Sequence, residues 1–169
     1  MNHKEIQCLL SKVDSFEIPN FYIIPKIDKD PIVGRPIVAG YNWITAPISK
    51  FVAHFLQASY KHFDTILKDS LSLVQILETR KFAGNIALYT IDVKSLYTNI
   101  PVDHAIQVIR EFLKKYPLEH GDFILECMEF VLKNNIMKFK NQIFGIAMGT
   151  PLAPVLANMC HRMTFQMNL

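Results

Sequence analysis

The stretch Asn85–Pro101, which reads NIALYTIDVKSLYTNIP, constrains the fold more than any other part of the chain. It opens with a nearly continuous apolar run that is typical of a strand covered on both faces, made of Ile86, Ala87, Leu88, Tyr89, Ile91 and Val93. Asp92 interrupts this run near its end. A buried carboxylate without a partner is costly, so Asp92 must be neutralised or must find a cation.

Composition limits the class of protein. The chain has 169 residues, 50% hydrophobic and 20% charged, which suits one domain with a real core and excludes a disordered polar chain. It has no apolar run of about 18 residues and no signal-peptide pattern at its start. Cys8, Cys127 and Cys160 are odd in number and far apart, which favours a reducing compartment. We therefore expect an intracellular protein, in the nucleus or cytoplasm, that is neither secreted nor bound to a membrane.

The charge balance is mildly basic, with a net charge of +3 and a pI of about 8.7. This balance permits a polyanionic partner but does not require one.

The first part of the chain combines strands and helices. Residues 1–20 hold a short helical pattern, and residues 21–40 alternate β-rich runs with proline and glycine, which predicts strand, turn and strand. Thr45 is expected to cap a helix that has Pro47 in its first turn. That helix carries an amphipathic stripe: Ile48, Phe51, Val52, Phe55, Leu56 and Tyr60.

Further helices flank the Asp92 strand. Asp69 or Ser70 is expected to cap a helix that ends at about Thr79. Pro101 starts another helix, whose apolar face holds Ala105, Ile106, Ile109, Phe112 and Leu113. A further helix is expected from a cap at Asp122 to about Asn134.

The last part of the chain predicts a hairpin and a helix. The hairpin turns at Lys140-Asn141, and a glycine-rich turn then leads into a helix that tolerates Pro151 and Pro154 in its first turn. Together these elements predict an α+β fold, with an antiparallel sheet and helices packed on one side of it.

Each candidate site has a plain structural alternative. Asp92 can cap the turn at Lys94-Ser95, or it can be a ligand of Mg²⁺ on a rigid strand. A two-metal site needs at least two carboxylates, so Asp92 alone does not make one. Lys26 and Arg35 can be solvated residues of a hairpin, or they can clamp a phosphate.

Two other candidates lie in turns. Tyr97 can be a packed turn aromatic. The glycines of GIAMGTPLAP can form a tight turn, or they can present backbone N–H groups to a phosphate. Cys160 and His161 are adjacent on a helix, so their side chains diverge and we interpret them as structural.

Three motifs occur in order along the chain. They are Pro-Lys followed by Arg-Pro-Ile within residues 25–37, TIDVKSLYTNIP at 90–101, and QIFGIAMGTPLAPVLAN at 142–158. In this order they resemble the reverse transcriptase domain of retroelements, over residues 20–165. The segments LYTNIP and GIAMGTPLAP are most similar to the corresponding sequences of the Penelope-like elements.

The resemblance implies an RNA-directed DNA polymerase, a nucleotidyltransferase of retrotransposons that takes an RNA template, a DNA primer and deoxynucleoside triphosphates. Asp92 matches the first catalytic aspartate, a ligand of two Mg²⁺ ions, and the carbonyl of Val93 matches a further ligand. Tyr97 matches the aromatic gate that excludes a ribose 2′-hydroxyl. Lys26 and Arg35 match the residues that hold the triphosphate.

The resemblance also implies a right-hand polymerase architecture with a partial antiparallel palm sheet. Gly149, Thr150 and Pro151 match the loop that lines the template and nucleotide, and Met148 stands where many relatives have Gln. Residues 1–84 would form the N-terminal and fingers-like region and residues 85–169 the partial palm.

The sequence departs from the family pattern in its carboxylates. It contains no Asp-Asp dipeptide and no Asp or Glu after Glu129, and no thumb or GIY-YIG-type endonuclease region precedes Leu169. We therefore expect two Mg²⁺ ions to be poorly held and the strand edge beside Asp92 to be open, which favours self-association through that edge. A non-catalytic nucleic-acid-binding relic and an inert fragment are the alternative interpretations.

These departures lead to a prediction about activity. We expect the purified chain alone to show no useful polymerase activity, because one carboxylate does not neutralise the charge that develops at the α-phosphate. Primer extension on an RNA template with Mg²⁺ measures this directly, and extension products would contradict the prediction.

Overall fold

The computed structural model describes residue 7 and residues 15–28, 30–63, 65–87, 89–91, 93, 96, 99–140, 142–144 and 149–167. The side chains of residues 142–144 and 164–167 are not part of this description. Most of the helical pattern predicted in residues 1–20 lies outside the described residues.

The described chain is an α+β protein. Its elements in order are β1 (Phe21–Lys26), β2 (Val33–Val38), η1 (Gly40–Asn42), α2 (Ala46–Gln57), η2 (Ala58–His62), α3 (Ser70–Thr79), α4 (Val102–Lys115), α5 (Gly121–Lys133), β3 (Met137–Phe139), β4 (Gln142–Phe144) and α6 (Ala153–Met167). No helix in this described part is both long and apolar enough to cross a membrane.

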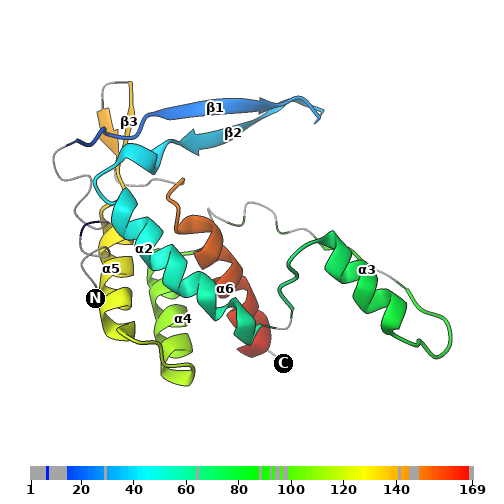
Figure 1. Cartoon of the computed structure of the whole chain (residues 1–169). Helices are drawn as coiled ribbons and strands as arrows, with labels where there is room; N and C mark the ends of the chain where they lie inside the picture. The colour runs from blue at the N-terminus through cyan, green and yellow to red at the C-terminus, as the bar shows by residue number, and fades with distance from the viewer. Residues whose placement is uncertain are drawn as a thin grey trace.

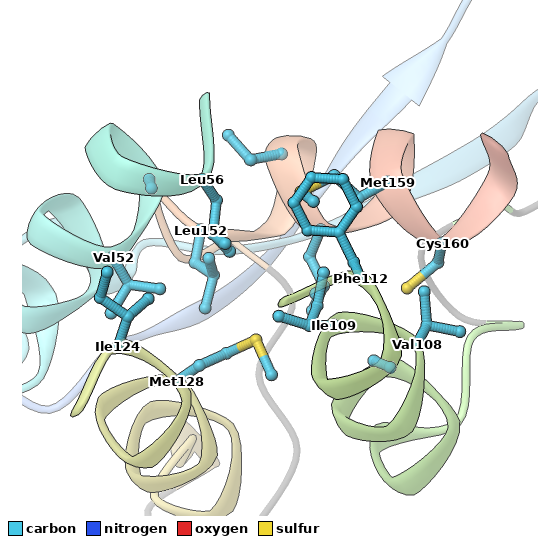
Figure 2. Packing of buried hydrophobic residues seen from close by; sticks show 14 of the residues in the cluster. Val52, Leu56, Val108, Ile109, Phe112, Ile124, Met128, Leu152, Met159 and Cys160 are labelled. Atoms are coloured by element: carbon cyan, nitrogen blue, oxygen red, sulfur yellow. The ribbon is translucent and has the colours of Figure 1, made fainter. Parts of the chain in front are cut away.

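Helices α2, α4, α5 and α6 enclose the hydrophobic core (Figure 1). The side chains that meet there come from every one of these helices or from the turn before α6 (Figure 2), among them Val52, Leu56, Ile109, Phe112, Ile124, Met128, Leu152 and Met159. The apolar stripes predicted on α2 and α4 face this core, because apolar side chains three and four residues apart lie on one side of a helix. The core therefore joins α2, from residues 1–84, with helices from residues 85–169.

The hairpins form separate two-stranded sheets. Strands β1 and β2 pair antiparallel, as do β3 and β4, and the described chain holds no larger sheet. Both hairpins were predicted from the turn residues. The rings of Phe21 and Phe139 meet edge to face at 5.1 Å, so the base of the β1–β2 hairpin packs on β3. From this base the β1–β2 hairpin extends across the top of the helices in this view (Figure 1).

The buried strand expected around Asp92 does not form among the described residues. Residues 85–87, 89–91 and 93 have no regular structure, and the side chains of Tyr89 and Ile91 are 85% and 87% exposed. A strand needs a neighbouring strand for its N–H and C=O groups, and no described segment pairs with this one. The prediction of a strand was therefore wrong for these described residues, and the strands of the described chain are those of the two hairpins.

The predicted helix caps are confirmed in part. Asp69 caps α3, because its Oδ1 accepts a hydrogen bond from the backbone N–H of Ser72 at 2.8 Å. Thr45 precedes α2 but makes no capping hydrogen bond with its side chain. Asp122 lies in the first turn of α5, and the cap position belongs to His120, which has a left-handed backbone with φ of 60°.

A buried hydroxyl joins α2 to the start of α6. The Oγ of Ser49 accepts a hydrogen bond from the backbone N–H of Leu152 at 3.0 Å, and both residues are fully buried. This N–H lies just before the helix, where no helical carbonyl is available to it. Ser49 therefore fixes the position of α6 against α2.

Ser49→Ala should lower the free energy of unfolding by about 1–3 kcal/mol, because it leaves a buried N–H without an acceptor. Urea denaturation followed by circular dichroism measures the loss. The matched control is Ser59→Ala, since the hydroxyl of Ser59 is equally buried but forms no hydrogen bond in the described chain. Equal losses for the two variants would contradict this role of Ser49.

Candidate functional site

A groove of about 1030 Å³ separates the β1–β2 hairpin from α6. Its wall on one side is β2 together with Lys26 at the end of β1, and its other side is the turn at 149–151 and one face of α6. Tyr41, Ile91, Val93 and Leu96 complete the lining. A smaller hollow of about 490 Å³ lies on α4 and α5 and contains none of the predicted site residues.

Every predicted site residue that the structure describes lines this groove. These residues are Lys26, Arg35, Val93, Gly149, Thr150 and Pro151. They come from segments that are far apart in the sequence, so the tertiary fold brings them together. The other predicted residues, Asp92, Tyr97 and Met148, lie outside the described residues.

The register of the hairpin places its two basic residues on one face. Lys26 pairs with Val33 and Arg35 pairs with Ile24. Because side chains alternate along a strand, Lys26, Ile24 and the residues opposite them share a face, and Lys26 and Arg35 are diagonal neighbours on it. Both cations can therefore contact the same anionic group.

Gly149 allows the turn before α6 to approach the end of β2 closely. A Cβ atom at this position would lie 2.0 Å from the carbonyl oxygen of Val38, and the φ angle of 126° is one that L side chains rarely adopt. Only glycine fits both requirements. This close approach holds the turn against the end of β2, and Thr150, the next residue of the groove lining, is buried.

The α6 side of the groove contains residues that sequence reasoning missed. Asn158, His161 and Arg162 line the groove beside Pro154, at spacings of one and two helical turns. The Nδ2 of Asn158 donates a hydrogen bond to the hydroxyl of Tyr60 at 3.2 Å, and Nη2 of Arg162 donates one to the carbonyl of Thr65 at 2.7 Å. In the sequence, the three- and four-residue spacing of these polar residues along the predicted helix could have indicated that they share one face.

Cys160 and His161 point in different directions, as their adjacency on a helix predicts. Cys160 belongs to the core, and burial raises the pKa of its thiol to about 12. The thiol is therefore protonated at neutral pH and is a poor nucleophile. His161 lies in the groove wall instead. The sequence predicted a structural role for both residues; this role explains the burial of Cys160 but not the position of His161 in the groove.

The groove is basic where it is described. Lys26, Arg35 and Arg162 line it together with His161, and no Asp or Glu occurs among its described lining residues. Cations gathered along a concave surface attract polyanions and raise the rate at which they bind.

The described residues alone do not fit a two-metal centre. Within the described chain no group of three or more His, Cys, Asp or Glu residues could hold a metal ion. Val93 lies in the groove wall and can offer only its backbone carbonyl, while Asp92 lies outside the described residues.

Comparison with known proteins gives no match from which the role of the site could be inferred. No protein-family model matches the chain, and neither a curated protein nor a solved structure matches it. The fold and the groove define an α+β protein with a basic groove between a β-hairpin and a helix.

The close approach at Gly149 generates a prediction. Gly149→Ala should lower the free energy of unfolding by more than about 1 kcal/mol, because the added Cβ meets the carbonyl of Val38 and the backbone must also keep a strained φ angle. Thermal and urea denaturation measure the change.

Gly84→Ala is the matched control. Gly84 also has a positive φ, of 81°, but nothing lies within 4 Å of an added Cβ. The difference between the two variants isolates the contact with Val38. If Gly149→Ala is no more destabilising than Gly84→Ala, the close approach does not hold the hairpin in place.

Proposed function

We propose that this chain is the fingers and first palm region of a reverse transcriptase of the Penelope-like type, and that the groove holds a deoxynucleoside triphosphate and the nucleic acid. The single observation that carries the proposal is the convergence of Lys26, Arg35, Val93 and the turn at 149–151 on one groove. The sequence resemblance assigned these residues to one nucleotide site, and their positions support that assignment.

The roles follow from the chemistry of each side chain. The fork of Arg35 and the ammonium group of Lys26 hold phosphate oxygens from one face of the hairpin. The turn at 149–151 lines the opposite wall for the nucleotide or template. Tyr97 would exclude a ribose 2′-hydroxyl, and Asp92 with the carbonyl of Val93 would hold Mg²⁺, which would supply positive charge at the phosphates.

The basic lining also favours a second function, nucleic-acid binding without catalysis. Lys26, Arg35 and Arg162 extend the positive charge from the hairpin to α6, whereas the described lining supplies no carboxylate. Contacts to a phosphate backbone require only such cations.

Binding to an RNA–DNA duplex tests the groove in both functions. The logarithm of the affinity should fall linearly with the logarithm of the salt concentration, and Arg35→Ala should weaken binding and reduce the slope by about 1 if Arg35 contacts one phosphate. Arg110→Ala, on the exposed side of α4, is the matched control. Unchanged affinity in Arg35→Ala would remove Arg35 from the groove's function.

Nucleotide binding separates the two functions. If the reverse transcriptase proposal holds, Mg²⁺ should increase the affinity for a deoxynucleoside triphosphate, and Asp92→Asn should abolish that increase without changing affinity in a chelator. Tyr97→Ala should reduce the preference for deoxynucleotides over ribonucleotides. Duplex binding with no effect of Mg²⁺ or Asp92→Asn would support the non-catalytic function, and no binding at low salt would contradict both.

A further inference from the structure

Helix α3 presents an apolar face that nothing in the described chain covers. All ten residues of Ser70–Thr79 are exposed except Ser72, which is half-buried beside the Asp69 cap. No substantial contact joins α3 to another described helix or strand, and the helix stands apart from the core helices (Figure 1). Leu71, Leu73, Val74, Ile76 and Leu77 are exposed by 36–64%.

The apolar residues of α3 form one stripe rather than a uniform surface. Leu73, Val74 and Leu77 share a face at spacings of one, three and four residues, with Leu71 and Ile76 on its two flanks. The polar residues Ser72, Gln75 and Thr79 occupy the opposite face. This arrangement is typical of a helix that packs against one partner surface along one side.

The charges at the two ends of α3 identify the partner. Lys68 and Asp69 precede the helix, while Glu78, Arg80 and Lys81 lie at its other end. None of these charged residues forms an ion pair within the described chain. In an antiparallel pair of two copies centred on α3, Asp69 would face Arg80, and Lys68 would face Lys81 while reaching Glu78 one turn away.

We propose that α3 pairs antiparallel with α3 of a second copy of this chain. In that arrangement Asp69 lies beside Arg80 of the second copy, and Lys68, which faces Lys81 of the second copy, can reach its Glu78 about one helical turn away. The helix dipoles also oppose one another favourably. A parallel pair would instead place Asp69 beside Asp69 and the basic residues beside each other, which repels. A two-fold axis through the middle of α3 relates the two copies.

The size of the surface sets the strength of the dimer. A helix of 10 residues is about 15 Å long, so one side of it buries less than the roughly 800 Å² per partner of a standard interface. The exposed side chains of Leu67 and Phe82, on the two flanking segments, can extend the contact. The pairing is therefore a weak equilibrium that responds to protein concentration, and it depends on neither function proposed for the groove.

Sedimentation equilibrium of the full chain tests the pairing. The wild type should show a reversible monomer–dimer equilibrium, and Leu77→Glu should weaken it at least tenfold, because it places a carboxylate in the middle of the apolar stripe. Gln75→Glu is the matched control: it adds the same carboxylate on the opposite face and should leave the equilibrium unchanged. Circular dichroism verifies that both variants keep their helices.

A charge exchange tests the antiparallel arrangement. Glu78→Lys should weaken the dimer about threefold or more, since two symmetric Lys–Lys pairs replace two Glu–Lys pairs. The double variant Lys68→Glu with Glu78→Lys should restore wild-type association at low salt. A chain that stays monomeric at every concentration would overturn the proposal, as would association that Leu77→Glu leaves unchanged or a double variant that fails to recover.

Discussion

The close approach between the turn before α6 and the end of β2 is the contact on which the candidate site depends. It requires Gly149, because any Cβ there would overlap the carbonyl of Val38. A second contact, from Ser49 to the N–H of Leu152, holds the same turn against α2. The two contacts act on residues three positions apart, so they link the hairpin to the helical core through one short segment. The groove exists because that segment is held from both sides.

The two faces of α6 differ, because one packs in the core and the other lines the groove. One face of this helix supplies Leu156, Met159 and Cys160 to the core, and another supplies Asn158 and Arg162 to the groove. Burial keeps the core face apolar and leaves Cys160 protonated, with a pKa of about 12. The groove face carries charge that stays partly exposed to water. A single helix thus joins the stability of the fold to the electrostatics of the candidate site.

The segment between η2 and α4 behaves differently from the rest of the described chain. The helical core leaves α3, residues 86 and 87 and residues 89–91 exposed, although α3 is rich in Leu, Ile and Val and Ile86 and Ile91 are apolar. Exposed apolar surface of this extent favours association, because burying it releases water from apolar groups. Helix α3 stands apart from the β1–β2 hairpin and α6 (Figure 1), and none of its residues lines the groove.

The local elements could be predicted from the sequence, because their causes are local. The stripe on α2, the Asp69 cap of α3 and the turn residues of both hairpins each depend on neighbours within a few residues. The strand expected at 86–93 does not form among the described residues, because a strand is completed only by a second segment, and β propensity does not supply one. The sequence alone thus determined the helices and the hairpins. It also indicated a set of basic and glycine residues that can each contact a phosphate. Only the tertiary structure decided that Lys26, Arg35 and Gly149 meet at one groove with Asn158 and Arg162, because contacts between distant segments depend on how the whole core packs.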